Sequence, residues 1–276
     1  MSEATATFGR TRATVWRRAG YWLTDAALLA GRGVRQMLRS PGTLFATTGL
    51  PVIFFVFFAY VLGSGMSSPG QPYVQFLFPG LLVATVTFST IPAVITGLHD
   101  DLNNGIIDRI RSTPASVSAV LLGRALADNL RNVLGSSVLL GLALLAGVRF
   151  SGGFPEALAA MALLLLYGFA VIAFAGYLTT AMRNVEAAQM IGTAVAGPLG
   201  FVSSLYADPA RMPVWLRVFA EQNPASHTGD ALRAWMGGTS AGSSLWYAVA
   251  WLVGATLLFG WLANRRVALA STPGQR

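Results

Sequence analysis

The chain has 276 residues, of which 54% are hydrophobic and only 11% charged, whereas soluble domains carry about 25% charged residues. A soluble fold this apolar would expose large sticky patches, so the composition indicates a polytopic, all-α membrane protein. All nineteen basic residues are arginine, which indicates a bacterium with a GC-rich genome; the formal charge of +8 reflects membrane topology and not a nucleic-acid partner.

The N-terminal region is predicted to lie on the cytoplasmic side. Residues 1–20 are predicted to be a flexible tail, and the first forty residues hold seven arginines without an apolar run, unlike a cleavable signal peptide. Residues 21–39 are predicted to form an interfacial amphipathic helix, with Arg32, Arg35 and Arg39 largely opposite its apolar side. Two roles stay open for it: an anchor to anionic lipid, or an elbow that transmits motion into the first span.

Six apolar segments are predicted to cross the membrane, each near the ~20 residues that a ~30 Å hydrocarbon core requires. They run over about 43–62, 76–98, 117–148, 157–182, 187–205 and 245–263. Residues 21–264 then form one transmembrane domain, followed by a tail over 265–276.

The arginines predict the orientation of these spans. If the N-terminus is cytoplasmic, only four of the nineteen arginines lie outside: Arg149, Arg211, Arg217 and Arg233. The positive-inside rule therefore places both termini in the cytoplasm of a multi-pass protein of the cell membrane.

The third span is too long and too polar for a simple crossing. Its 32 residues would reach about 48 Å, and its first half carries Arg124, Asp128 and Arg131 on one helical face. An ionisable cluster at membrane depth is a functional candidate. The alternative, which we favour, is an interfacial salt-bridge cluster on a helix that extends below the bilayer.

The connection over 206–244 is the longest between spans. Residues 212–220 and 226–236 are predicted to form two short helices, separated by a break at Asn223-Pro224. Trp215, Trp235 and Trp246 are typical of an aromatic belt at the headgroups. We interpret this segment as a lid-like or re-entrant element.

No catalytic or metal site is predicted. The chain has no cysteine, and because it has no lysine it has no P-loop. His99 and His227 fall on opposite membrane sides, and Ser226, His227 and Asp230 only superficially resemble a hydrolase set. We interpret Asp100 and Asp101 as helix-start charges and not as cation ligands.

A charged island follows the second span, after a stretch from Arg39 to His99 without any charged side chain. Within it, Ile106, Ile107 and Ile110 share one face of a predicted short helix, and Ser112-Thr113-Pro114 ends that helix. An apolar face with a charged rim is typical of a helix that inserts into a partner's groove. Packing against the ends of neighbouring spans is an equal alternative.

Several motifs resemble the membrane subunits of type-2 ABC exporters, most of all the daunorubicin-resistance permease branch. They are Phe78-Pro79-Gly80-Leu81-Leu82, the island from Asp100 to Pro114, the stretch from Ser118 to Asp128, and Asn223 to Arg233. The resemblance in layout extends from about Tyr21 to Ala263, with the segment from Gly105 to Asp128 its most specific part.

This resemblance implies a non-catalytic permease subunit of an ATP-driven exporter of a hydrophobic or amphiphilic compound. ATP and magnesium would bind a separate P-loop ATPase subunit, and the permease would form a homodimer or pair with a paralogue. The ATPase-coupling helix would consist of Gly105, Ile106, Ile107, Asp108, Arg109, Ile110, Arg111, Ser112, Thr113 and Pro114.

The cluster of Arg124, Asp128 and Arg131 would stiffen the lower end of the third span. An ion-coupled secondary transporter and a non-transporting membrane scaffold remain alternatives. Against the first, the middles of the other five spans contain no Asp or Glu.

Overall fold

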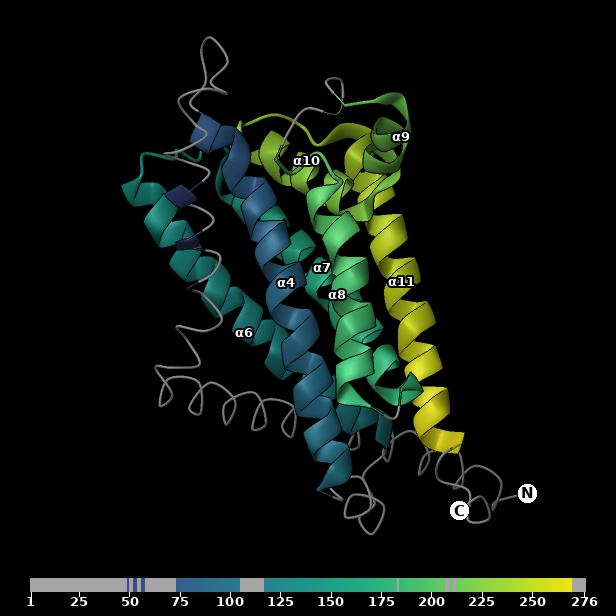
Figure 1. The fold of residues 1–276 in the computed structure, drawn as a ribbon. Coiled ribbons are helices and arrows are strands. Elements are labelled where there is room, and N and C mark those ends of the chain that lie inside the picture. The colour runs from purple at the N-terminus through teal and green to yellow at the C-terminus, as the bar shows by residue number, and fades with distance from the viewer. Residues whose placement is uncertain are drawn as a thin grey trace, which may run out of the picture.

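Five long helices stand side by side and two short helices cover one end of them in the computed structural model (Figure 1). It describes residues 49, 52–53, 56–57, 73–104, 117–182, 184–206, 209 and 212–269. The helices in this part are α4 (Tyr73–Asn103), α6 (Val117–Leu145), α7 (Phe154–Ala181), α8 (Val185–Phe201), α9 (Val214–Gln222), α10 (Pro224–Met236) and α11 (Gly242–Leu269). These residues include no strand, so the all-α prediction is confirmed for them.

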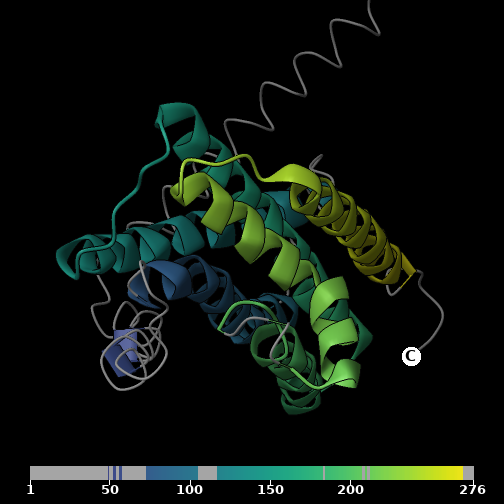
Figure 2. The ribbon, with the colours of Figure 1, turned by 90° about the horizontal axis from the view of Figure 1, so that it is seen from above.

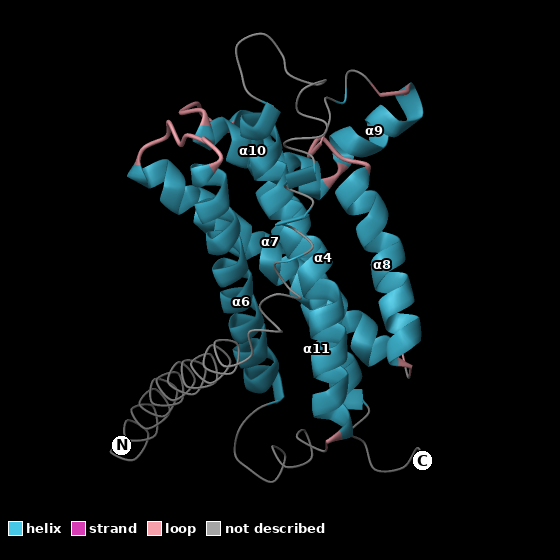
Figure 3. Cartoon of the chain, turned by 60° about the vertical axis from the view of Figure 1, so that its left-hand side comes forward, coloured by secondary structure: helices cyan, strands magenta, loops and turns pink. Residues whose placement is uncertain are grey.

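Consecutive long helices run in alternate directions (Figures 1 and 3), as in a chain that crosses a membrane repeatedly. We call the end that carries α9 and α10 the upper end, and the opposite end, where α4 and α11 finish, the lower end. Among the described residues, α4, α7 and α11 are long and apolar enough to span a membrane. The predicted span over 43–62 and the predicted amphipathic helix over 21–39 lie almost wholly or wholly outside the described residues.

Capping residues explain where several helices begin. The Asn184 side chain accepts a hydrogen bond from the Glu186 N–H at the start of α8, and Asn223 accepts one from the Ala225 N–H at the start of α10. Pro224 occupies the first turn of α10, where its missing N–H costs nothing. The break predicted at Asn223-Pro224 is therefore the boundary between α9 and α10.

Two boundaries differ from the predicted spans in a way that matters for function. Helix α4 continues to Asn103, so His99 to Asn103 belong to its last turns and not to a loop. Helix α8 ends at Phe201, because the chain turns over 202–206 and buries Ser203, Ser204 and Leu205 beneath α10.

Helix α4 is the most buried of the three span-length helices and contacts α6, α7, α8 and α10 (Figure 2). Its upper half joins a core with α7, α10 and α11 that includes Val83, Tyr167 and Leu232. Its lower half packs on α7 and α8 through Ile91 and Ile95. A displacement of α4 therefore reaches every neighbouring helix.

Close packing against neighbouring segments explains two of the glycines. A methyl group on Gly80 of α4 would clash with the backbone of Leu205, and one on Gly192 of α8 would clash with the Ile91 side chain. Small residues at helix interfaces let membrane helices pack closely. This close packing matters because lipid tails surround apolar side chains as well as protein does. Gly80 thus fixes the distance between α4 and the turn after α8.

Gly80→Ala is expected to lower the stability of the protein, because the added methyl group meets backbone that cannot rotate away. Overpacking of this kind costs about 1–3 kcal/mol. Thermal unfolding in detergent, followed by fluorescence-detected size exclusion, measures the effect. The matched control is Gly141→Ala in α6, where an added methyl group meets no atom within 4 Å; equal unfolding temperatures for the two variants would contradict the packing argument.

Candidate functional site

Four charged side chains gather in the lower half of the interface between α4 and α6. Arg124 of α6 forms an ion pair with Asp101 of α4, and its Nε lies 3.6 Å from the Asp128 Oδ2 atom. Arg131 Nη1 lies 3.4 Å from the other carboxylate oxygen of Asp128, whose residue is only 5% exposed. The predicted cluster contained Arg124, Asp128 and Arg131 but not Asp101. Asp101 links this cluster on α6 to helix α4.

The interpretation of Asp100 and Asp101 as helix-start charges is wrong, because both lie in the last turn of α4. Acidic side chains are unfavourable there, since the end of a helix carries partial negative charge. Arg124 supplies the opposite charge to Asp101 from the neighbouring helix. Gly97 makes room for this contact, because a methyl group at that position would clash with the Arg124 guanidinium.

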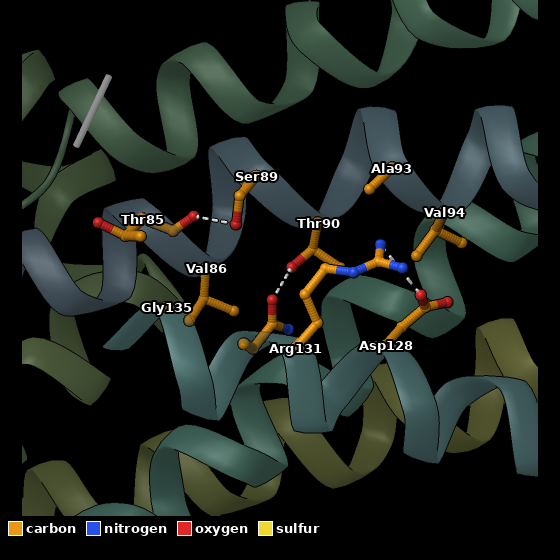
Figure 4. Close-up of a pocket in the computed structure, with 10 residues that line it drawn as sticks. Thr85, Val86, Ser89, Thr90, Ala93, Val94, Asp128, Arg131 and Gly135 are labelled. Atoms are coloured by element: carbon orange, nitrogen blue, oxygen red, sulfur yellow. Dashed lines mark hydrogen bonds and ion pairs between the residues drawn. The ribbon is translucent and has the colours of Figure 1, made fainter. Parts of the chain in front are cut away.

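A polar crevice continues from this cluster toward the upper end (Figure 4). Thr90 Oγ1 of α4 donates a hydrogen bond of 3.0 Å to Asn132 Oδ1 of α6, and Ser89 Oγ donates to the Thr85 carbonyl. The crevice encloses about 10 Å³, room for about one water molecule. Its side chains tie α4 to α6 in a region where apolar contacts alone do not favour protein over lipid.

At the upper end, Arg233 of α10 lies at the centre of a second network. Its Nη1 lies 2.6 Å from Asp230 Oδ1, its Nε donates to the Phe76 carbonyl at 3.1 Å, and its Nη2 donates to the Ser204 carbonyl at 3.2 Å. The guanidinium also lies 4.0 Å from the centre of the Phe76 ring. One side chain therefore joins α10 to the start of α4 and to the turn after α8.

Two opposing effects act on the pKa of this arginine. Burial lowers the pKa of Arg233, while the neighbouring Asp230 carboxylate raises that pKa and accepts its hydrogen bond. Asp230 also accepts a hydrogen bond of 2.9 Å from the Ser204 hydroxyl. The Arg233–Asp230 pair thus holds α10 to its neighbours and is not a free binding surface.

The structure gives Ser226, His227 and Asp230 separate partners. Ser226 Oγ accepts the backbone N–H of Ser204, and the His227 ring stacks on Tyr247 at 5.3 Å. Asp230 is engaged by Arg233, so no serine–histidine–aspartate relay exists among them. In the described part of the chain, no three acidic, histidine or cysteine side chains are grouped to hold a metal ion.

The predicted coupling helix, Gly105 to Pro114, lies outside the described residues. The ends that flank it are described: α4 finishes at Asn103 and α6 begins at Val117. Asp101 and Arg124 join these two helices close to that connection.

Comparison with known proteins identifies the family of this chain. The model of the ABC-2 type transporter family matches residues 24–236. The chain belongs to this family. It is 33% identical over 212 residues, 76% of this chain and 74% of the relative, to the daunorubicin resistance ABC transporter permease protein DrrB1 of Streptomyces coeruleorubidus. It is 25% identical over 230 residues, 80% of each chain, to the probable doxorubicin resistance ABC transporter permease protein DrrC of Mycobacterium tuberculosis.

The resemblance to type-2 ABC exporter permeases is therefore confirmed, and the ABC-2 match covers both networks. Sequence reasoning found the i, i+3 and i, i+4 spacing of the α6 cluster but missed Asp101 and the role of Arg233. The sequence does contain a signal for the role of Arg233, since Asp230 and Arg233 are three residues apart in a predicted helix.

Arg233→Lys is expected to destabilise the upper end, because an ammonium cannot reproduce the planar set of contacts to Asp230, Phe76 and Ser204. We expect a loss of about 2 kcal/mol, the scale of hydrogen bonds to a charged group. Thermal unfolding of the purified protein measures it.

Arg149→Lys is the control, since Arg149 is exposed and its hydrogen bonds to Gln75 use only backbone atoms. If both substitutions shift the unfolding temperature equally, the network around Arg233 does not stabilise the fold.

Proposed function

We propose that the chain is the membrane permease subunit of an ATP-driven exporter that moves a hydrophobic or amphiphilic compound out of the cell. The observation that carries this function is the ABC-2 match together with a 33% identical relative named as a daunorubicin resistance permease. By analogy with the two relatives, a drug of the anthracycline type is the first compound to test.

The energy source in this proposal is a separate P-loop ATPase that binds ATP and magnesium. The chain contributes no catalytic residue and no cofactor. Its lack of lysine supports this division, because a P-loop needs a lysine to reach the phosphates. Two permease subunits, identical or paralogous, would enclose the transport route, with both termini and Gly105 to Pro114 on the cytoplasmic side of the cell membrane.

The charged cluster gives this coupling a mechanical basis. Asp101 and Arg124 tie the end of α4 to the start of α6, so both helices move together when the connection between them is pushed. Arg131 and the buried Asp128 form a further ion pair within α6, which stiffens this part of the helix. We infer that docking of the ATPase at Gly105 to Pro114 displaces the two helices as a unit.

Helix α4 can pass this displacement to the upper end. Arg233 binds the Phe76 carbonyl near the start of α4 and, through Ser204, the turn after α8. A shift of α4 along or across the bundle therefore changes the position of α10. In this proposal the segment with α9 and α10 closes the exit while the lower end is open, which is alternating access.

Ile107→Asp and Ile110→Asp are expected to weaken binding of the ATPase, because a carboxylate on the apolar face of the coupling helix would be desolvated in the groove. The expected loss is about tenfold or more in affinity, that of a contact worth at least ~1.4 kcal/mol. Co-purification with a candidate P-loop ATPase subunit that is co-expressed with this chain measures binding.

The control for this pair is Val214→Asp, at an exposed apolar position on α9 at the opposite end of the bundle. Undiminished association of Ile107→Asp and Ile110→Asp with the ATPase would refute the coupling assignment.

Asp101→Asn is expected to reduce drug export while leaving ATPase association intact, because the link between α4 and α6 is weakened but the docking face is unchanged. A coupling energy of ~1.4 kcal/mol corresponds to about a tenfold reduction. Export of an anthracycline from proteoliposomes, per ATP hydrolysed, measures the coupling. Glu186→Gln is the control, at an exposed acidic position in the first turn of α8; identical export ratios for both variants would contradict the role of Asp101.

A further inference from the structure

A lateral cleft of about 430 Å³ lies in the lower half of the bundle, between α4, α6, α7 and α11. Helix α7 contacts both α6 and α11, which stand on either side of it when the bundle is seen from above (Figure 2). Sites for small organic ligands enclose about 300–1,000 Å³ and are mostly apolar. The cleft meets both conditions within a single copy of the chain.

Small residues leave this space open. Ala125 of α6, Ala173 and Gly176 of α7, and Gly260 and Ala263 of α11 all line it. A methyl group built on Gly260 meets no atom within 4 Å, and one built on Gly176 is at 3.9 Å from the only side chain near it, Leu98. The cleft is therefore a property of the backbone arrangement and does not depend on one rotamer.

Leu257 and Trp261 of α11 form the mouth of the cleft. Their side chains line it and remain 68% and 56% exposed. On a helix that faces lipid, such a mouth opens to the hydrocarbon and admits a molecule dissolved in the membrane.

One wall of the cleft is polar, because Arg124 and Asp128 line it. Arg124 Nε donates no hydrogen bond and Asp128 Oδ2 accepts none, although both atoms are buried. The two atoms are 3.6 Å apart, too far for a hydrogen bond to each other. Buried polar groups are normally satisfied, so one unused donor and one unused acceptor lie side by side in the residues of this wall.

The charges around this wall favour an uncharged head group. Asp101 and Asp128 match Arg124 and Arg131, and the Asp100 carboxylate also acts on Arg124, so no unmatched arginine is left to select an anion. A hydroxyl or amide can accept from Arg124 Nε and donate to Asp128 Oδ2 at once, whereas a cation or an anion would be repelled by one of them.

We propose that this cleft binds one amphiphilic molecule, with its apolar body along α7 and α11 and an uncharged hydroxyl or amide head group between Arg124 and Asp128. The molecule enters from the lipid past Leu257 and Trp261. This is the loading site for the exported compound, an assignment that rests on the proposed export function; binding in the cleft does not depend on it.

The test uses the full chain with its ATPase in proteoliposomes, without ATP, and a diazirine-labelled long-chain alcohol as the probe. Irradiation followed by mass spectrometry identifies the labelled peptides. We expect labelling on α7 and α11 around Ala173 and Leu257. A methyl ether of the same probe, which lacks the donor, is expected to label them less.

Gly260→Leu places a side chain into open space of the cleft, and it is expected to reduce this labelling about tenfold, as the loss of ~1.4 kcal/mol of binding would. Gly254→Leu is the matched control, because Gly254 lies on the same helix, has open space around it and does not line the cleft. It is expected to retain the labelling of the unmodified chain. Equal unfolding temperatures for the two variants establish that both are folded.

Equal labelling of Gly260→Leu and Gly254→Leu would overturn the binding site. Equal labelling by the alcohol and its methyl ether would overturn the head-group assignment and indicate an ordinary lipid chain. Export by Gly260→Leu at the rate of Gly254→Leu would overturn the loading role. If no variant and no unmodified protein exports any compound, the proposed function fails while cleft labelling stands.

Discussion

A bilayer gives apolar side chains no reason to prefer a protein neighbour over lipid, and this constraint governs how the bundle is held together. The position of α4 among its neighbours accordingly depends on contacts that lipid cannot supply. Gly80 and Gly192 allow close approach of neighbouring segments. Thr87 Oγ1 and the buried Tyr167 hydroxyl lie 2.6 Å apart and join α4 to α7. Asn129 Nδ2 donates to the Leu165 carbonyl and joins α6 to α7. These polar links are few and specific, so they determine which helices are neighbours.

The charged side chains complete this arrangement at both ends of α4. Near its lower end, Asp101 receives Arg124 from α6, and near its upper end the Phe76 carbonyl receives Arg233 from α10. Burying an unpaired charge is far more costly than burying a paired one, so each partner holds the other in place. Helix α4 is thereby fastened to the helix that follows it at one end and to the cap of the bundle at the other. In the proposed function this geometry matters, because force that an ATPase applied at one end would not be absorbed by loose packing.

Local patterns in the sequence predicted much of the helical architecture, and long-range pairing explains what they missed. The periodicity around Asn223-Pro224 predicted the short helices α9 and α10, because neighbouring residues determine where a helix begins and ends. The pairing of Asp101 with Arg124 is not local, and the charged run from His99 suggested a loop where α4 in fact continues. Helix α8 ends earlier than its hydropathy suggested, because apolar residues such as Leu205 are buried in a turn by tertiary packing. Gly105 to Pro114 falls outside the described residues, so the island stays a prediction.

The shortness of α8 has a consequence for the surrounding bilayer. Its seventeen residues give a length of about 26 Å, less than the ~30 Å hydrocarbon thickness of an average membrane. The thirty-one residues of α4 make a helix that is much longer than this thickness. The two helices therefore differ in the hydrocarbon thickness that each would fit. If α8 crosses the membrane as the six-span prediction has it, the bilayer beside it would thin to match its length, at a cost of fractions of a kcal/mol per ångström. Under that prediction, acyl-chain length in the host membrane would act on this protein through α8, the shortest of the five long helices that the structure describes.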